Sequence, residues 1–247
     1  MRYQGAFGSL TDVGKVRISN EDQAFAASNN LGEVMLLVCD GMGGQNKGDC
    51  ASKLARDFIH DSFQKKRRIP GFLLPFYVSN LLKKANSLIY SESQRSSRYE
   101  GMGTTCCLAL ISGETLVVGN VGDSRCYCFD SGVLTQLSQD QTYVDYLYRT
   151  GKITKAQTTT RSDRHVLLNA LGIYPSSSSS EVKRLHYSGQ SILLCSDGLY
   201  NNLPEAEIRA ILSTDDRVDE KIASLIEEAN SNGGSDNIAV SYFEANR

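Results

Sequence analysis

Short apolar runs and longer amphipathic stretches divide the chain into predicted strands and helices. The runs are rich in aliphatic and β-branched residues, which is typical of strands. They cover Val34–Cys39, Thr104–Ile111, Thr115–Val121, Arg125–Phe129, Ser191–Cys195 and Asn237–Phe243. The turn signals Ser-Gly-Glu and Asp-Ser-Gly follow the second and fourth runs, so we expect antiparallel hairpins there.

Apolar residues recur at helical spacing in three segments, 51–63, 74–89 and 222–229. We expect strands, two helices, a block of strands, an irregular stretch, a strand, two short helices and a final strand. Strands that arrive in blocks favour an α+β fold with antiparallel sheets over a doubly wound fold. From Gln139 to Ser180 the periodicity weakens, which predicts exposed loop with a flexible serine run at 176–180.

Composition is typical of a globular protein with a sizeable core, because 40% of the 247 residues are apolar and 22% are charged. The net charge of −2 argues against a general attraction to nucleic acid or to an anionic membrane. No run approaches the roughly 18–20 apolar residues of a membrane span, and the N-terminal segment lacks the apolar region of a secretory signal. We therefore expect a cytoplasmic protein.

Seven cysteines require an interpretation. Their odd number and the absence of a Cys-x-x-Cys pair argue against both a disulfide framework and a zinc site. Most lie in apolar runs, where a reduced cysteine behaves as a small hydrophobic residue. We therefore expect no catalytic thiol among them.

Two apolar runs end at an aspartate followed by glycine, at Asp40 and at Asp197. Five short acidic motifs share this placement at strand edges or beside glycine. They are RISNED (17–22), CDGMGG (39–44), VGDSR (121–125), SDGL (196–199) and GGSDN (233–237). Taken singly, each is an ordinary turn. Together they would raise each other's pKa in one pocket unless a hard cation filled it.

Mg²⁺ and Mn²⁺ fit such a pocket, because both prefer oxygen ligands, take few protein carboxylates and retain waters. A glycine after a ligand aspartate lets its own carbonyl approach the same ion. The three histidines do not favour a zinc hydrolase. His60 lies in a predicted helix and His186 in a predicted surface strand, which leaves His165 near the acidic motifs.

These motifs, with TDVGKVRISNED (11–22) and GTT (103–105), stand in the order found in the PPM/PP2C family of metal-dependent Ser/Thr protein phosphatases. From Thr11 to about Phe243 the chain resembles the bacterial branch of that family. The resemblance implies a four-layer α-β-β-α sandwich, in which helix pairs flank two antiparallel sheets. It implies one domain over residues 1–247, with a flap at about 142–164 that either contacts a phosphoprotein or is a solvated mobile loop.

The resemblance also implies a dinuclear centre that holds two Mn²⁺ or Mg²⁺ ions. Asp40 would bridge both ions, and the Gly41 carbonyl would bind one of them. Asp197 and Asp236 would complete the protein ligands of the other ion. Each ligand aspartate would then be held at the rigid end of an apolar strand.

Further positions of the family motif have supporting roles. Glu21 and Asp22 match outer-shell positions that act through metal-bound water. Asp123 matches an acid linked to a third, weaker metal, which Asp197 would help to hold. Arg17 matches the phosphate-binding arginine, and a guanidinium fork suits paired phosphate oxygens.

Two departures from the family pattern concern proton transfer. Eukaryotic members carry a histidine after the first Asp-Gly, proposed as the general acid, whereas this chain has Met42, which bacterial members share. A metal-bound water could serve instead, and His165 is the second choice. In the sequence LSQDQT, Gln141 stands where a histidine is common, so we expect Asp140 to be structural rather than catalytic.

The activity implied is hydrolysis of phosphoserine and phosphothreonine in proteins by a metal-activated water, without a phosphoenzyme. Two alternatives stay open: a non-catalytic regulatory module on the same fold, and another dinuclear-metal hydrolase such as a phosphodiesterase. The expected partners are phosphorylated proteins, including a eukaryotic-like Ser/Thr kinase and its targets. We expect a monomer that binds neither nucleic acid nor membrane.

Overall fold

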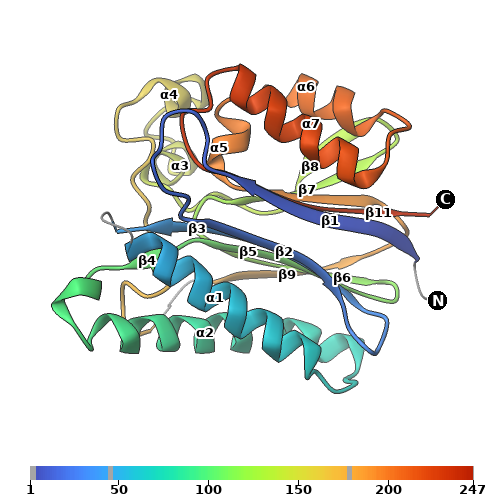
Figure 1. Cartoon of the computed structure of the whole chain (residues 1–247), viewed down its shortest axis with the longest axis horizontal. Helices are drawn as coiled ribbons and strands as arrows, with labels where there is room; N and C mark the ends of the chain where they lie inside the picture. Colours follow the sequence, from blue (N-terminus) through green and yellow to red (C-terminus); the bar gives the residue numbers. More distant parts are fainter. Residues whose placement is uncertain (1–3, 44–46, 177–179, 247) are drawn as a thin grey trace.

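Two antiparallel β-sheets lie face to face, and helices cover both outer faces (Figure 1). The computed structural model describes residues 4–43, 47–176 and 180–246. Gly44 of the CDGMGG motif and residues 177–179 of the serine run lie outside these described residues. The arrangement confirms the predicted α+β, four-layer architecture.

The first sheet has the strand order β1-β11-β10-β7-β8, and all of its pairings are antiparallel. Its strands are β1 (Gly5–Asp12), β11 (Ile238–Ala245), β10 (Ser191–Cys195), β7 (Arg125–Asp130) and β8 (Val133–Gln136). Pairing of β1 with β11 over its whole length joins the two ends of the chain. This pairing supports the prediction of one domain over residues 1–247, which stays a prediction.

The second sheet has the order β2-β3-β5-β6-β9, with β4 paired to the end of β3. Its strands are β2 (Asp22–Ser28), β3 (Val34–Met42), β4 (Gly103–Thr104), β5 (Cys106–Ser112), β6 (Thr115–Val121) and β9 (Glu181–His186). The predicted strand 104–111 is thus split at Thr105. The backbone N–H of Thr105 donates to the Asp40 carbonyl, in the register shared by the β3–β5 and β3–β4 pairings.

Three layers of apolar side chains separate the elements. One lies between the two sheets, and the other two lie between each sheet and its helices. The helices on the second sheet are α1 (Lys47–Gln64) and α2 (Leu74–Ser93), preceded and followed by the short 3-10 helices η1 (Gly71–Leu73) and η2 (Ser97–Tyr99). Those on the first sheet are α5 (Asp197–Tyr200), α6 (Glu205–Leu212) and α7 (Val218–Ser231).

Helical spacing explains which faces are buried. In α7, the buried residues Ile222, Leu225, Ile226 and Ala229 lie three or four positions apart and face the first sheet. The two predicted hairpins are confirmed as β5–β6 and β7–β8. The tight β7–β8 turn has positive φ at both Ser131 (50°) and Gly132 (78°), which matches the twist of an antiparallel hairpin.

The four strands outside the six predicted runs are the four edge strands, β1, β2, β8 and β9. Only the surface strand around His186, within β9, was expected. An edge strand is less covered than a central one, so its apolar positions are interrupted by exposed ones. Strand β8 shows the effect, since only Leu134 of its four residues is buried.

The flap contains two short helices where weak periodicity predicted only loop. Helix α3 spans Tyr143–Arg149 and α4 spans Lys155–Thr160. Val144 and Leu147 of α3 are buried, and the side chain of Thr142 caps the helix by accepting from the Asp145 N–H. A helix of two turns offers too few apolar positions for its period to be recognised in the sequence.

All seven cysteines are free, and five of them are buried. Burial raises the pKa of the Cys39, Cys107 and Cys195 thiols, which therefore stay protonated. The interpretation of these residues as small hydrophobic side chains is confirmed. Among the described helices, none combines the length and the apolar character that crossing a bilayer requires.

Candidate active site

Asp22 and Asp40 lie directly opposite each other on β2 and β3, at one end of the second sheet. The backbone of Asp40 is fixed on both sides: its N–H donates to the Thr105 Oγ1 (2.9 Å), and its carbonyl accepts from the Thr105 N–H (2.8 Å) and the Thr104 Oγ1 (2.9 Å). Like charges directly across a strand pair are unfavourable. The sheet therefore holds two carboxylates in an arrangement that costs stability.

Gly41 occupies a position that admits no side chain. A Cβ there would lie 2.6 Å from the Glu21 carbonyl oxygen and would also collide with the Gly48 backbone. The Gly41 N–H donates to the Glu21 carbonyl (3.2 Å). This close approach joins the end of β3, the segment before β2 and the start of α1, and it places the Gly41 carbonyl against Gly48.

Ser196 connects the two sheets at the site. It directly follows β10 of the first sheet, and its hydroxyl donates to the Asp22 Oδ2 (2.6 Å) and accepts from the Ala239 N–H (2.8 Å). The next residue, Asp197, begins α5, and its side chain is 13% exposed. The hydrogen bond from Ser196 thus brings Asp197 to the end of the sandwich where Asp22 and Asp40 lie.

Asp236 and Arg17 form an ion pair at the rim of the same site. The Arg17 Nη2 lies 2.8 Å from the Asp236 Oδ2, and their side chains are 55% and 33% exposed. Asn237 anchors the loop that carries Arg17, because its amide donates to the Val13 and Ser19 carbonyls while its oxygen accepts from the Glu21 N–H. One asparagine beside Asp236 therefore orders the whole β1–β2 loop.

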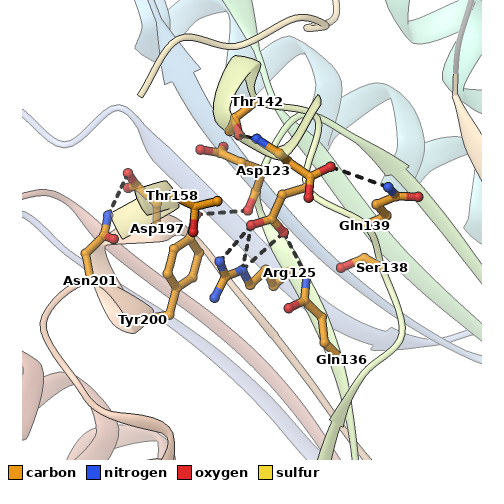
Figure 2. Close-up of polar contacts among 12 residues, drawn as sticks. Asp123, Arg125, Gln136, Ser138, Gln139, Thr142, Thr158, Asp197, Tyr200 and Asn201 are labelled. Carbon is orange, nitrogen blue, oxygen red and sulfur yellow. Dashed lines mark hydrogen bonds and ion pairs between the residues drawn. The ribbon is translucent and has the colours of Figure 1, made fainter. Parts of the chain in front are cut away.

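Asp123 approaches from the β6–β7 connection and is 7% exposed. The Tyr200 hydroxyl donates to its carbonyl (3.1 Å), and the Arg125 guanidinium stacks on the Tyr200 ring at 3.5 Å from the ring centroid (Figure 2). Arg125 also donates to both carboxylate oxygens of Asp140 at 2.7–3.1 Å. As expected, Asp140 is a structural partner, and it fixes the arginine that supports Tyr200 and Asp123.

Electrostatics show that the acids share one environment. Burial raises the pKa of Asp22 to about 8, and the charges of Asp197, Asp236 and Asp123 raise it further. Burial also raises the pKa of Asp40 well above its usual range, with Asp22 the strongest repulsive neighbour. The pKa of Asp123 rises to about 7, first through burial and then through repulsion by Asp197.

These acids fit a hard divalent cation. Asp22 and Asp123 are buried and Asp40 is half-buried, and within the described residues none of the three forms an ion pair. Burial and the neighbouring aspartates raise their pKa values, a state that a bound cation would relieve. Within the described residues, no three Asp, Glu, His or Cys side chains lie close enough to ligate a single ion. The arrangement suits Mg²⁺ or Mn²⁺, which take few protein carboxylates and keep waters.

Arg17 supplies the positive charge nearest to this cluster. Its pKa is raised by the hydrogen bond to Asp236 and by the charges of Asp236, Asp197 and Asp40, against the lowering effect of burial. Its guanidinium therefore interacts electrostatically with three of the predicted metal ligands, Asp236, Asp197 and Asp40. A cation on the Asp236 Oδ2 would compete with Arg17 for that oxygen.

The positions with other predicted roles are also near the cluster. Glu21 contributes its carbonyl to Gly41 and also accepts from the Ser52 hydroxyl (2.6 Å). The His165 Nδ1 lies 3.9 Å from the Asp197 Oδ2, and the nearby Asp197 carboxylate raises the pKa of His165. Met42 ends β3 beside Gly41, where it offers no proton.

Thr105, Ser196 and Asn237 have functional contacts that sequence reasoning missed. Each stands next to or within a quoted motif: GTT, SDGL and GGSDN. A signal was available, because a hydroxyl or amide beside a strand-end aspartate is a candidate to fix that aspartate's backbone. The identity of each partner, however, depends on the fold.

A cavity of about 490 Å³ separates the flap from the acids. Its lining includes Asp123 and Asp197 on the sandwich side and Thr158 on the flap side (Figure 2). His165, which follows the flap, also lines it. The predicted placement of the flap beside the active site is therefore borne out. A larger hollow of about 910 Å³ lies between α6, α7 and the far ends of β1 and β11, and none of the predicted site residues is in its lining.

The fold and the site define a protein of the phosphatase class, and comparison with known proteins gives the family. The family model described as "Protein phosphatase 2C" matches residues 15–239. The chain therefore belongs to the protein phosphatase 2C family. This confirms the resemblance inferred from the motifs and the predicted enzyme class, a protein phosphatase.

Relatives and solved structures agree along the whole chain. The "Serine/threonine phosphatase stp" of Listeria innocua is 34% identical over 239 residues, which cover 96% of this chain and 94% of that protein. The crystal structure of Stp1 from Staphylococcus aureus matches with a TM-score of 0.91 and 30% identity, covering 99% of this chain and 96% of that one. The catalytic domain of PstP, crystallised with two manganese ions, matches with a TM-score of 0.85 and 29% identity over 98% and 99%.

Proposed function

We propose that this protein phosphatase hydrolyses phosphoserine and phosphothreonine in proteins, and that it does so with two Mn²⁺ or Mg²⁺ ions held by the strand-end acids. One observation carries the proposal: Asp22, Asp40 and Asp123 have pKa values raised by burial and by neighbouring aspartates, and none of them forms an ion pair with a described residue. The PstP relative crystallised with two manganese ions supports a metal centre. When bound, such ions supply an activated water and neutralise charge on a phosphoryl group.

The ligand roles follow from where each group lies. We assign the bridging carboxylate to Asp40, because its backbone is fixed by Thr105, and a further ligand to the adjacent Gly41 carbonyl. Asp197 and Asp236 reach the cluster from the first sheet and are assigned to the second ion. Their placement at rigid element ends limits the rearrangement that cation binding would require.

The remaining acids are assigned to outer positions. Asp22 is committed to the Ser196 hydroxyl through one oxygen, and Glu21 supports Gly41, so both suit an outer-shell role. Asp123, on the other side of Asp197, is the candidate for a third and weaker site together with Asp197. No step of the reaction is assigned to these groups.

Arg17 is assigned to phosphate binding. It is 55% exposed at the rim, its charge faces the acids, and its guanidinium can donate two parallel hydrogen bonds to phosphoryl oxygens. In the protein without substrate the same guanidinium donates to Asp236. We infer that Arg17 exchanges this carboxylate for a phosphoryl group when substrate binds.

Phosphorylated proteins are the proposed partners, in line with the names of the relatives. A eukaryotic-like Ser/Thr kinase and its targets stay a prediction, as do the monomeric state and the cytoplasmic location. A non-catalytic module on this fold is disfavoured by the presence of every predicted ligand. A phosphodiesterase is the alternative that needs a direct test.

The test compares three substrates with and without metal. Hydrolysis of a phosphothreonine peptide and of p-nitrophenyl phosphate should stop with EDTA and return with Mn²⁺, while bis-p-nitrophenyl phosphate should be hydrolysed far more slowly. Calorimetry should show Mn²⁺ binding to the wild type and weaker binding to Asp197→Ala. Faster diester hydrolysis would replace the proposal, and hydrolysis that persists in EDTA with no Mn²⁺ binding would refute it.

A further inference from the structure

The connection between α1 and α2 concentrates positive charge in a chain that is negative as a whole. Residues 62–91 contain six Lys and Arg and no Asp or Glu, although the net charge of the chain is −2. Lys66 pairs with Glu33 and is buried. Lys65, Arg67 and Arg68 are exposed and form no ion pair with any residue in the described ranges. The net charge therefore conceals a local cationic surface.

Exposed apolar side chains lie directly beside these cations. Phe72 is 66% exposed, Leu73 37% and Phe76 72%. Single exposed apolar residues are common, but two phenylalanines within five positions at one helix start are not explained by scatter. Neither phenylalanine has a polar atom that could gain from contact with water.

Helix α2 extends the same surface. Lys83 and Lys84 lie seven and eight positions after Phe76, that is two turns further along the same helical face, and both are exposed. Together, residues 65, 67, 68, 72, 73, 76, 83 and 84 form what we term the α2 corner. The nearest exposed acids are Asp61 of α1 and Glu114 of the β5–β6 turn, which is close to Gly71.

The α2 corner lies at the end of the molecule opposite to the candidate active site. Lys66 bonds Glu33, which precedes β3, whereas Asp40 is near the other end of that strand, roughly 23 Å away at about 3.3 Å per residue. In Figure 1 the α1–α2 connection and the flap helices lie at opposite ends of the sandwich. A surface bound at this corner would leave the active site open.

We propose that the α2 corner binds an anionic membrane surface, with Lys65, Arg67 and Arg68 facing lipid headgroups and Phe72 and Phe76 inserted into the interface. Clustered basic residues beside exposed phenylalanines are typical of peripheral membrane attachment. Anionic headgroups supply the charge that the corner lacks, and the acyl boundary accepts apolar rings that have no hydrogen-bonding group. The protein would thereby present its active site away from the bilayer.

The membrane is favoured over a nucleic acid because of the apolar component. Nucleic-acid surfaces combine basic residues with polar or stacking groups that read phosphate and base edges. At the α2 corner the large apolar side chains exposed between the two cationic segments are Phe72, Leu73 and Phe76, which contact hydrocarbon better than phosphate. This inference departs from the expectation of no membrane binding, which rested on the net charge and on the absence of a membrane-spanning run.

The test measures co-sedimentation of the full chain with vesicles. Wild type should pellet with vesicles of equal parts phosphatidylglycerol and phosphatidylcholine at low salt, should be released by high salt, and should not pellet with phosphatidylcholine alone. The variant Arg67→Ser/Arg68→Ser should bind about 30-fold more weakly. The variant Phe72→Ser/Phe76→Ser should bind these vesicles at least about 10-fold more weakly than the wild type.

The matched control is Arg98→Ser/Arg209→Ser, which removes two exposed arginines that form no ion pair with a described residue, outside the α2 corner. It should bind like the wild type. All three variants change exposed side chains, so each should keep the wild-type thermal midpoint and p-nitrophenyl phosphate hydrolysis.

Three outcomes would overturn the proposal. Wild type could stay in the supernatant with anionic vesicles, or the control could lose as much binding as Arg67→Ser/Arg68→Ser, or Phe72→Ser/Phe76→Ser could bind like the wild type. Binding of a DNA duplex that is weakened by Arg67→Ser/Arg68→Ser, without vesicle binding, would assign the corner to polyanions in general.

Discussion

Two carboxylates at opposite ends of β3 have pKa values that are shifted in opposite directions. Glu33 precedes the strand, and its side chain is 8% exposed. Burial alone would raise its pKa, but hydrogen bonds from Lys66, Asn29 and Ser112 outweigh this effect and leave the pKa lowered. At this end of the sheet the fold supplies a buried carboxylate with every partner it needs.

Asp40 lies near the other end of the same strand, and its pKa is raised well above the usual range. Burial is the main cause, and Asp22 directly across the strand pair adds repulsion. The backbone of Asp40 is as well bonded as any in the sheet, so the difference is confined to the carboxylate. At one end of the strand, Glu33 is bonded by side chains of the protein. At the other end, the Asp40 carboxylate is left to be neutralised by a bound ligand.

Asp140 shows that compensation was also available close to the site. Arg125 donates to both of its oxygens and stacks on Tyr200, whose hydroxyl reaches Asp123. The desolvated arginine is paired, whereas Asp123 next to it is not. Within the described residues, the lack of an ion pair at Asp22, Asp40 and Asp123 is therefore specific to these groups and is not a property of the region.

The sharpest way to break this comparison is to neutralise one carboxylate at each end. Asp40→Asn should lower hydrolysis of p-nitrophenyl phosphate by roughly a thousandfold or more, since the bridging group is lost. It should not lower the thermal midpoint of the protein in EDTA, because an uncompensated charge has been removed. Activity close to the wild type, or a large loss of metal-free stability, would contradict the role given to Asp40.

Glu33→Gln is the matched change at the other end and should have the opposite signature. It leaves Lys66 buried without its partner, which should cost about 3–5 kcal/mol of unfolding free energy. Urea denaturation measures the loss, and the activity of the folded fraction should be unchanged. The double variant Glu33→Gln/Lys66→Met should recover much of the stability. A cost below about 1 kcal/mol would mean that the pair behaves like a surface ion pair.

The sequence predicts the acids at the candidate active site far better than it predicts the Glu33–Lys66 ion pair at the other end of β3. Asp40 and Asp197 were recognisable because an apolar run stops at Asp-Gly, and both features are local. The Glu33–Lys66 pair joins residues 33 positions apart, and nothing in the local pattern of either one indicates it. Likewise, the hydrogen bond from Ser196 to Asp22 spans 174 positions and exists only because the two sheets face each other.

The elements show the same division. Central strands such as β3 and β5 were predicted because both of their faces are buried and their apolar runs are continuous. Edge strands such as β1 and β8 were missed, and so were the flap helices, whose few buried residues depend on tertiary contacts. Burial on both faces leaves a mark in the sequence, whereas partial burial does not.

A pH series would sharpen the comparison in the metal-free protein. The folded pKa of Asp22 is about 8 and that of Asp123 about 7, both above the ordinary value of about 3.9. The folded state therefore holds protons that the unfolded chain releases. The stability contributed is full below about pH 4 and is lost as the pH rises through about 7 and 8.

The expected size is about 2–3 kcal/mol for Asp22 between about pH 6 and about pH 8. Thermal midpoints in EDTA should fall over this range, and Asp22→Asn should flatten the fall. Glu33→Gln should leave the slope unchanged, because the lowered pKa of Glu33 places its own transition below this window. A midpoint that is constant or rises with pH would show that the acids are compensated in a way the contacts do not reveal.

The smallest expected effect tests whether the Arg125–Asp140 ion pair influences Asp123 through Tyr200. Tyr200→Phe keeps the ring on which Arg125 stacks and removes only the hydroxyl that donates to the Asp123 carbonyl. Loss of this hydrogen bond should lower the free energy of unfolding by about 1 kcal/mol. It should also lower the affinity of the last Mn²⁺ ion to bind by about tenfold. Calorimetric titration with Mn²⁺ measures the second effect, and it is independent of turnover.

Tyr174→Phe is the control, since this tyrosine is 63% exposed and lies away from Asp123. It should titrate like the wild type. If Tyr200→Phe also titrates like the wild type while losing stability, then the hydroxyl supports the fold alone, and the orientation of Asp123 must come from the β6–β7 connection itself. If only Tyr200→Phe weakens the last Mn²⁺ binding step, then the Arg125–Asp140 ion pair positions Asp123 through Tyr200, which contacts both Arg125 and Asp123.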